Sequence, residues 1–246
     1  MIKKEIFAIV TGCASGIGNE IANRLVSKGI EVIGLDIEEC TCDFPSYVCD
    51  VSDERQVQQI LALISKRTQC IDYLINAAGI LCIGKALLLK EMSVKQWDAI
   101  LKINLGSVMV MSKNVYPYML HSDRGAIVNI SSEQVYNPDL GYSSYAVSKS
   151  AINMLTICTA KEFLKDKIRV NAIALGTVKT NILKYLDVSE EQKELMFKNK
   201  KEQIPFGLMS RSDVADIIEF LISDHARFIT GEIIRCDGGK YLRDNP

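Results

Sequence analysis

Residues 6–18 read IFAIVTGCASGIG, an apolar run followed directly by a glycine-rich turn. Ile6–Val10 has the length and the continuous apolar character of a strand buried on both faces of a parallel sheet. Gly12, Gly16 and Gly18 then allow a tight turn into a helix that we expect to run to about Lys28. A strand, a glycine-rich turn and a helix in this order are typical of a site that binds a pyrophosphate at the free N–H groups of the helix N-terminus.

An acidic residue stands where it can distinguish the two nicotinamide dinucleotides. Asp36 follows Gly18 by eighteen residues and ends the second predicted strand. A carboxylate there accepts hydrogen bonds from both adenosine ribose hydroxyls and repels a 2′-phosphate. No lysine or arginine occupies positions 13–15 or 37, where a cation could neutralise that phosphate. The sequence therefore predicts NAD(H) rather than NADP(H) as the cofactor.

Short apolar runs alternate with longer helical patterns along the rest of the chain. Such repeated β-α-β units predict one α/β domain, a Rossmann-type doubly wound sheet of about seven parallel strands with helices on both faces. Asp50 and Val51 end the third strand, where an adenine ring would rest, and residues 37–49 leave little room for a helix before them. The other candidate strands are Glu31–Leu35, Tyr47–Cys49, Ile71–Ile75, Ala126–Ile130, Arg169–Ala174 and Glu232–Cys236.

Serines mark the expected starts of three helices. Ser52 precedes two acidic residues, Ser93 forms a capping-box pattern with Gln96, and Ser212 precedes an aspartate. The polar, lysine-rich segment 177–208 breaks the alternation between the last two strands. Because long insertions in compact domains often cover binding sites, we interpret this segment as a substrate flap rather than as a solvated surface helix.

The composition gives no reason to expect a nucleic acid, membrane or metal partner. Of 246 residues, 48% are hydrophobic and 24% are charged, and the net charge of −1 creates no attraction to polyanions. No apolar stretch approaches the length of a bilayer span, and Ile6–Val10 is too short for a signal-peptide core, so we expect a cytoplasmic protein. The eight cysteines lack paired CxxC spacing, and we expect reduced thiols and no metal site.

A tyrosine and a lysine lie four residues apart in GYSSYAVSKS, residues 141–150. On a helix, Tyr145 and Lys149 share one face, whereas Tyr142 pairs with Ala146. A lysine ammonium about 4 Å from a phenol favours the phenolate by up to roughly 4 kcal/mol, or roughly three pKa units. Tyr145 is therefore a candidate acid/base, with Lys149 lowering its pKa.

Over essentially its whole length, the chain resembles the classical short-chain dehydrogenase/reductase family. The order and spacing of the matching stretches carry this resemblance. They are TGCASGIG, NAAG at Asn76–Gly79, KINLGS with Asn104, IVNISS with Ser132, YAVSK with Tyr145 and Lys149, RVNAIALGTVKT at Arg169–Thr180, and ITGEIIRCDGG near the end.

The resemblance implies a catalytic tetrad of Asn104, Ser132, Tyr145 and Lys149. Tyr145 would move the proton, Ser132 would hold the substrate oxygen, and Asn104 would hold a water that links the lysine to solvent. Lys149 would also hold the nicotinamide ribose. We expect the cofactor to contact Gly12, Ser15, Gly16, Ile17, Gly18, Asp36, Asp50, Val51, Asn76, Ala77, Gly79, Tyr145, Lys149, Gly176, Val178 and Thr180.

One position departs from the family pattern, and the substrate residues are less specific. Leu175 replaces the usual proline before Gly176, which we expect to loosen the backbone facing the nicotinamide. The expected substrate contacts, drawn from Leu81–Cys82, the 133–140 loop and the flap, are Leu81, Glu133, Gln134 and Tyr142. Their polar groups suit a small-molecule substrate that is a cyclic diol, sugar-like compound or hydroxy acid.

Several alternatives stay open at this point. The stretch NAAGIL and the short link after Asp36 are similar to dehydrogenases that oxidise a dihydrodiol to an aromatic diol. The second reading is a 3-oxoacyl-(acyl-carrier-protein) reductase-like enzyme, although that subgroup mostly uses the phosphorylated cofactor. A third is a non-catalytic NAD-binding sensor or scaffold. The family also implies a homotetramer, or a homodimer, formed through the helix that carries Tyr145 and Lys149.

Overall fold

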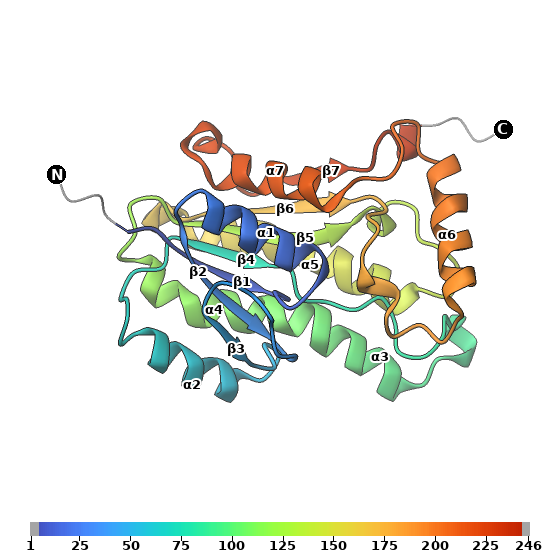
Figure 1. The fold of residues 1–246 in the computed structure, drawn as a ribbon, viewed down its shortest axis with the longest axis horizontal. Helices are drawn as coiled ribbons and strands as arrows, with labels where there is room; N and C mark the ends of the chain where they lie inside the picture. The colour runs from blue at the N-terminus through green and yellow to red at the C-terminus, as the bar shows by residue number, and fades with distance from the viewer. Residues whose placement is uncertain (1–4, 243–246) are drawn as a thin grey trace.

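The computed structural model describes residues 5–242, which build one seven-stranded parallel sheet in the order β3-β2-β1-β4-β5-β6-β7 (Figure 1). All six neighbouring strand pairs are parallel, and Thr11 pairs with both Leu35 and Asn76. The strands are β1 (Phe7–Thr11), β2 (Glu31–Asp36), β3 (Ser46–Val48), β4 (Tyr73–Asn76), β5 (Ala126–Ser132), β6 (Arg169–Leu175) and β7 (Ile233–Cys236). The predicted Rossmann-type doubly wound sheet is confirmed.

Helices cover both faces of this sheet, because successive residues of each buried strand point to opposite sides. Ala8 and Val10 of β1 pack with α1 and α7 in one hydrophobic core, whereas Phe7 and Ile9 pack with α2 and α4 in the other. The helices on the first face are α1 (Gly16–Ser27) and α7 (Arg211–Ile222). Those on the second are α2 (Glu54–Ile64), α4 (Ser107–Met119) and α5 (Ser143–Phe163), with α3 (Val94–Leu101) beside α5.

The strand order reverses between β1 and β4, and this reversal positions the site. The chain leaves β1 toward one side of the sheet and returns at β4 to continue toward the other. The carboxyl ends of β1 and β4 therefore diverge into loops on opposite faces, and ligands of doubly wound folds bind in the crevice between them. Thr11 bridges this crevice at its base, since its hydroxyl accepts hydrogen bonds from the backbone N–H groups of Ala77 and Ala78 at 3.0 Å each.

Helix starts agree only in part with the sequence. The capping box of Ser93 and Gln96 is present at α3, and no helix separates β2 from β3. The side chain of Asp53, not Ser52, caps α2, and α7 begins two residues earlier than expected because Ser210, not Ser212, forms the capping box with Asp213. In both cases the N-cap is the residue whose side-chain oxygen accepts from the free N–H groups of the first turn, and the expected serine lies one or two positions away.

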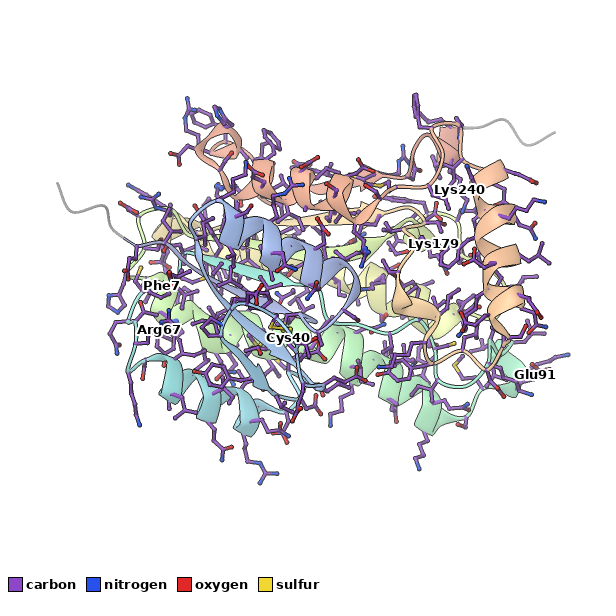
Figure 2. The ribbon with its side chains drawn as sticks, viewed as in Figure 1. Phe7, Cys40, Arg67, Glu91, Lys179 and Lys240 are labelled. Atoms are coloured by element: carbon purple, nitrogen blue, oxygen red, sulfur yellow. A yellow bond between two sulfur atoms is a disulfide. The ribbon has the colours of Figure 1, made fainter. Side chains whose placement is uncertain are left out.

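Two local features of the described chain were not predicted. Cys40 and Cys42 form a disulfide beside the amino-terminal strands, with Cα atoms 5.4 Å apart, so the expectation of eight reduced thiols was wrong there (Figure 2). Side chains two residues apart in an extended chain point to the same side, which brings these two cysteines together.

Lys102–Gly106 forms one turn of π-helix between α3 and α4, named η2. Such turns often occur at functional sites.

The segment 177–208 crosses the carboxyl end of the sheet as a short helix η5 (Asn181–Leu183) followed by α6 (Glu190–Glu202) (Figure 1). Leu183 and Leu186 are buried against Leu81, Tyr142 and Tyr145 in a small separate core. The remaining short helices are η1 (Leu89–Glu91), η3 (Glu133–Val135), η4 (Leu164–Asp166), η6 (Asp224–Ala226) and η7 (Lys240–Leu242). Within residues 5–242 no helix has the length and apolar character needed to cross a membrane.

Candidate active site

The glycine-rich turn is shaped by two backbone approaches that no larger residue permits. Gly12 has φ +73°, and a Cβ on it would lie 3.0 Å from the backbone of Ala78. A Cβ on Gly18 would lie 2.2 Å from the carbonyl oxygen of Gly12. Gly16 has φ +61° but faces open space, where the nearest atom to an added Cβ is the Thr180 side chain at 3.7 Å. The turn therefore folds tightly on itself and leaves its outer side free for a ligand.

The N-terminus of α1 is built to receive an anion. Its N-cap residue, Ser15, makes no side-chain hydrogen bond to the helix, and the first turn contains no acidic residue. The free N–H groups and the positive end of the helix dipole thus face the cleft without a protein partner. A diphosphate supplies the charge and the acceptors that this terminus lacks.

Asp36 lies at the end of β2 with its carboxylate held by two backbone donors. One oxygen accepts a hydrogen bond from the N–H of Ala14 at 2.9 Å, and the other accepts one from the N–H of Glu38 at 3.1 Å. These bonds hold both oxygens at the rim of the cleft. A nucleoside with free ribose hydroxyls fits this carboxylate, since each hydroxyl can donate to an oxygen that still has a free lone pair.

A cavity of about 460 Å³ connects these features. It runs from Asp36 and Asp50 past the glycine-rich turn to Tyr145 and Lys149. Among the predicted cofactor residues, those that line it are Gly12, Ser15, Gly16, Ile17, Gly18, Asp36, Asp50, Val51, Ala77, Gly79, Tyr145, Lys149 and Thr180. An extended dinucleotide fits this cavity. It would meet the Asp36 carboxylate at one end, the N-terminus of α1 in the middle and Tyr145 with Lys149 at the other end.

Tyr145 and Lys149 are both buried on the sheet-facing side of α5, at the end of this cavity. The Lys149 ammonium lies 5.7 Å from the centre of the Tyr145 ring and donates a hydrogen bond to the Ile130 carbonyl at 2.8 Å. The predicted spacing on one helix face is therefore realised. The lysine is held by the backbone of β5.

Burial, rather than the lysine, dominates the pKa of Tyr145 in the chain alone. Loss of water raises this pKa to about 12, a hydrogen bond with Ser132 lowers it by less, and the charge of Glu133 raises it further. Burial also lowers the pKa of Lys149 to about 8. The expected net lowering of the phenol pKa by Lys149 was wrong for this state, because both charged forms lose hydration in the same buried place.

Asn104 lies in the π-helical turn and is fully buried. Its amide oxygen accepts a hydrogen bond from the Ile80 N–H at 2.9 Å, and its amide nitrogen donates to the Ile80 carbonyl and to the Ser148 hydroxyl. A Cβ on Gly79 would stand 3.2 Å from the Asn104 oxygen and 3.5 Å from the Lys149 nitrogen. A side chain at position 79 would therefore crowd both Asn104 and Lys149, whereas glycine leaves space beside them.

Ser132 ends β5, and its hydroxyl accepts a hydrogen bond from the Gln134 N–H at 3.2 Å. It lines a second cavity, of about 140 Å³, which shares with the first the lining residues Ile17, Ile130, Tyr145, Thr180 and Ile182. Its neighbour Ser131 lines the same cavity, and its hydroxyl donates to the carbonyl of Lys149 at 3.3 Å. The serine hydroxyl and the tyrosine thus border the place where the two cavities join.

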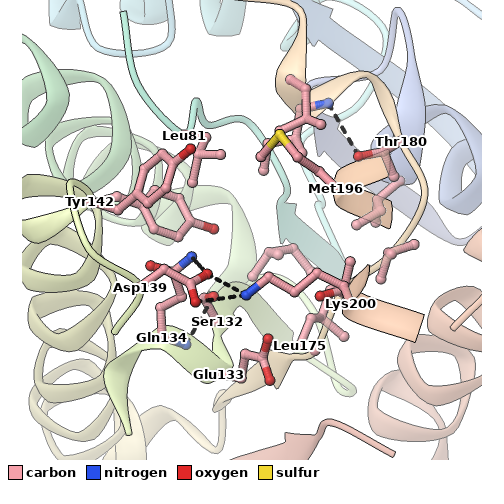
Figure 3. Close-up of a pocket in the computed structure, with 18 of the residues that line it drawn as sticks. Leu81, Ser132, Glu133, Gln134, Asp139, Tyr142, Leu175, Thr180, Met196 and Lys200 are labelled. Atoms are coloured by element: carbon pink, nitrogen blue, oxygen red, sulfur yellow. Dashed lines mark hydrogen bonds and ion pairs between the residues drawn. The ribbon is translucent and has the colours of Figure 1, made fainter. Parts of the chain in front are cut away.

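Charged and amide side chains surround the outer part of this second cavity (Figure 3). Lys200 of α6 forms an ion pair with Asp139, whose carboxylate also accepts a hydrogen bond from Gln134 at 3.1 Å. Glu133 is paired with Lys240 at 2.7 Å, and these two side chains are only 10% and 11% exposed. The charges of the lining are therefore paired.

All four predicted substrate residues line the second cavity, but three predicted cofactor residues do not line the first. Gly176 and Val178 line the second cavity instead. Asn76 lines neither, because its amide donates to Asn129 at 2.8 Å, and Asn129 donates in turn to Thr156. Leu175 is part of β6, and the Gly176 N–H donates to the Cys236 carbonyl at 2.7 Å, so the backbone there is tied into the sheet rather than loosened.

Residues from the lysine-rich segment reach both cavities, which sequence reasoning did not resolve. Lys184 and Tyr185 line the first cavity, and Met196, Phe197 and Lys200 line the second. The sequence marked the whole segment as a flap. It carries no periodic signal that tells which of its lysines points inward, because α6 has no buried residue.

Comparison with known proteins agrees with this geometry. A family model described as enoyl-(acyl carrier protein) reductase matches residues 12–240. The 3-oxoacyl-(acyl-carrier-protein) reductase FabG of Thermotoga maritima is 32% identical, with 94% of this chain and 96% of that protein covered. The 2,3-dihydro-2,3-dihydroxybenzoate dehydrogenase of Escherichia coli is 32% identical, with 95% and 96% covered. The ligand-free aldohexose dehydrogenase of Thermoplasma acidophilum superposes with a TM-score of 0.91 at 32% identity, covering 99% and 96%.

These relatives differ in the substrates that their names give, but they share one family and one kind of reaction. Their similarity extends along nearly the whole chain, from the glycine-rich turn to the last strand. The chain therefore belongs to the short-chain dehydrogenase/reductase family and is an oxidoreductase.

Proposed function

We propose that the protein is an NAD(H)-dependent oxidoreductase that interconverts a secondary alcohol and a ketone on a hydroxylated small molecule. The observation that carries this proposal is the position of Tyr145, which lines both cavities at their junction. A group there can reach a substrate oxygen in the smaller cavity and a cofactor in the larger one. Ser132 borders the same junction from the end of β5.

The lining of the larger cavity supports the proposal of NAD(H) as the cofactor. Asp36 would accept hydrogen bonds from the adenosine ribose, the N-terminus of α1 would bind the diphosphate, and Lys149 would hold the second ribose. The bound cofactor supplies the hydride acceptor or donor. Asp50 and Val51 line the adenosine end of the cavity, and Thr180 reaches it from the segment 177–208.

Proton movement is the work of the chain's own side chains. In ketone reduction, the Tyr145 hydroxyl donates a proton to the substrate oxygen while Ser132 donates a hydrogen bond to the same oxygen. With a pKa of about 12, Tyr145 is present as the neutral phenol at neutral pH and is ready to act as this acid. In alcohol oxidation the same oxygen must receive the proton, and a protonated Lys149 beside the ring stabilises the phenolate.

Asn104 is proposed to position this pair rather than to touch substrate. Its amide is held at both ends by Ile80 and also bonds the hydroxyl of Ser148 on α5. Ser148 precedes Lys149, so the amide fixes α5 against the π-helical turn. Asn104 is also proposed to take part in a path that carries the proton onward to solvent, because its oxygen and the Lys149 nitrogen both border the space beside Gly79.

The substrate class follows from the second cavity. Glu133, Gln134, Asp139, Tyr142 and Lys200 bring carboxylate, amide, phenol and ammonium groups to its wall. A substrate with several hydroxyls can exchange hydrogen bonds with such groups, whereas a plain hydrocarbon would leave them unsatisfied. Two of the relatives described above are named for a cyclic dihydrodiol and for aldohexoses, which supports a cyclic hydroxylated substrate.

A second candidate function has its own support. The reductase FabG is as similar to the chain as the dihydrodiol dehydrogenase, at 32% identity. Leu81, Leu183, Met196 and Phe197 give the cavity an apolar side that a 3-oxoacyl chain could contact. This candidate predicts reduction of a 3-oxoacyl thioester, which the first candidate does not.

Two features of the whole chain belong to the same proposal. We propose that the chain forms one domain in which the segment 177–208 acts as a flap over the substrate. Lys200 from α6 and Leu183 and Leu186 from the preceding stretch already connect it to the site. We also propose that the protein assembles as a homotetramer through the outer face of α5.

The test is a substrate panel with purified protein. NAD+ reduction would be followed with cyclic diols, aldoses and hydroxy acids, and NADH oxidation with a 3-oxoacyl thioester. We expect turnover of one hydroxylated class, and loss of about 100-fold or more in kcat for Tyr145→Phe, because the proton then has no carrier. Tyr142→Phe is the matched control, since it removes a phenol hydroxyl from the same cavity without removing the acid/base.

The outcomes separate the candidates. Turnover of the thioester alone would replace the first candidate with the second. No turnover of any compound, with NADH binding retained, would instead favour a non-catalytic dinucleotide-binding protein. Tyr145→Phe should leave the dissociation constant of NADH within about threefold, because only one cofactor contact changes.

A further inference from the structure

An ion pair closes the adenosine end of the larger cavity. Glu38 follows Asp36 by two residues, and Lys184 lies directly after η5 in the segment 177–208. The Lys184 ammonium donates to the Glu38 carboxylate, although the two residues are 146 apart in sequence. Both residues line the cavity that also contains Asp36. The pair thus joins the loop after β2 to the flap, across the place where an adenosine would lie.

Lys184 is the cation at this end of the cavity. Among the residues that line it, only Lys149 and Lys184 are lysines or arginines, and Lys149 lies at the opposite end beside Tyr145. The hydrogen bond to Glu38 is the largest cause that raises the pKa of Lys184, and the charge of Asp36 contributes as well. Lys184 therefore stays protonated and lies within the electrostatic field of the carboxylate that faces the ribose.

The charges at this rim decide how a 2′-phosphate is received. Asp36 and Glu38 carry one negative charge each and Lys184 carries one positive charge, so the three together are negative. A 2′-phosphate would add up to two further negative charges beside them. Glu38 opposes the binding of a 2′-phosphate in two ways. Its carboxylate repels the phosphate, and it holds by a hydrogen bond Lys184, the lysine at this end of the cavity that could pair with the phosphate.

We propose that Glu38, acting on Lys184, is a second determinant of cofactor choice and excludes NADP(H) together with Asp36. This inference rests on the proposed function, in which the cavity takes NAD(H). It differs from the reading of Asp36 alone, because a lysine lines the same cavity as Asp36 and is held in an ion pair with Glu38. Removing Glu38 should release that lysine toward the phosphate, whereas removing Lys184 should leave two carboxylates facing it.

Direct binding measures this choice without any substrate. Dissociation constants of NADH and NADPH would be determined by fluorescence titration of the purified protein, and the ratio of NADPH to NADH constants compared among variants. We expect Glu38→Gln to lower that ratio by about 5- to 10-fold and Lys184→Gln to raise it by a similar factor. The double variant restores the net charge of the rim and should return near the wild-type ratio.

Neighbouring charges provide matched controls. Glu39→Gln removes an exposed carboxylate next to Glu38 that does not line the cavity, and it should leave the ratio unchanged. Lys179→Gln removes a lysine of the segment 177–208 that pairs with Glu194 rather than with Glu38, and it should also leave the ratio unchanged. The shift caused by Glu38→Gln should shrink in 0.5 M salt, because half-exposed charges are screened there.

The possible results distinguish failure of this inference from failure of the proposed NAD(H) dependence. A wild-type protein that prefers NADPH, or that binds neither nucleotide, would overturn the proposed NAD(H) dependence itself. A wild-type preference for NADH with an unchanged ratio in Glu38→Gln would overturn only the role of the ion pair. A ratio that moved equally in Glu39→Gln would attribute the effect to overall charge and would overturn it as well.

Discussion

The pKa of Tyr145 depends on a nearly buried ion pair whose two residues lie outside the tyrosine's own helix. Glu133 lines the second cavity, which we propose as the substrate cavity, and its negative charge raises the pKa of Tyr145. Lys240, from the short helix after β7, neutralises Glu133 at 2.7 Å in a nearly water-free place. The balance of these two charges therefore adjusts how readily the phenol gives up its proton, in addition to the effect of Lys149.

This arrangement predicts opposite pH shifts for two single changes. Glu133→Gln removes the negative charge and leaves Lys240 positive, so the pKa of Tyr145 falls and the phenolate forms at lower pH. The rising limb of kcat/KM for alcohol oxidation should move to lower pH by roughly half to one unit. Lys240→Met leaves Glu133 unpaired and should move the same limb to higher pH. The measurement is the pH profile of kcat/KM between pH 6 and about 10.

A remote lysine serves as the control for these shifts. Lys113→Met removes an exposed lysine of α4 that pairs with Glu54 of α2 and lines neither cavity, and its profile should match that of the wild type. Shifts of the two variants in one direction would contradict a charge effect on Tyr145. Thermal unfolding of each variant would show whether it is folded, because an unpaired buried charge is destabilising.

At the scale of elements, the regular parts of the fold could be predicted and the irregular ones could not. Each predicted strand overlaps an observed one because a buried parallel strand needs a continuous apolar run, and such runs are visible in the sequence. Helix starts depend on which of several neighbouring polar residues caps the helix, so Ser52 and Ser212 were wrong while Ser93 was right. The competition between adjacent caps is decided by geometry and not by composition.

The site divides in the same way. The glycine-rich turn, Asp36, Tyr145 and Lys149 stand at fixed spacings on regular elements, so their meeting in one cavity could be predicted. The π-helical turn around Asn104 and the inward lysines of the segment 177–208 have no such spacing. Lys184 meets Glu38 only through the path of a long insertion, which no local pattern encodes.

The weakest-held element of the described chain should be α6. It has no buried residue, and Lys200–Asp139 is the ion pair that ties it to the outer wall of the substrate cavity. Elements with few buried contacts open most readily. Hydrogen exchange measured by mass spectrometry should therefore be fast in α6 and slow in α5, and NADH with a product should slow exchange in α6. Asp139→Asn should speed it in the free protein.

Exchange in α6 as slow as in α5 without any ligand would contradict a flap that opens. Exchange that is fast but indifferent to NADH and product would show a loose surface helix with no part in closure. Lys193–Glu190 lies within α6 itself, so Glu190→Gln is the matched control, because it removes an ion pair that does not reach the substrate cavity.

At the scale of the molecule, both cavities lie at the carboxyl edge of the sheet, where strand ends, the loops that follow them and the helices α5 and α6 supply the lining residues. The sheet and its two hydrophobic cores supply a rigid base, and the flap joins the cofactor end through Lys184 and the substrate end through Lys200. Residues of the segment 177–208 thus line both cavities. Cofactor binding at the first cavity should consequently influence how the second cavity receives its substrate.

The last prediction concerns the outer face of α5. While Tyr145 and Lys149 face the sheet, Val147, Met154 and Ile157 form an exposed apolar stripe on the other side, with Met154 60% exposed. Spacings of seven and three residues keep these side chains on one face of a helix. Two copies of α5 packed along this stripe would bury it, and the same contact would fix the helix that carries the acid/base. We expect light scattering after size exclusion to give the mass of a tetramer. Met154→Glu should reduce it to a smaller species, because two glutamates would face each other across the contact, whereas Met154→Leu should not. A monomeric wild type, or a tetramer unaffected by Met154→Glu, would show that α5 does not form this contact.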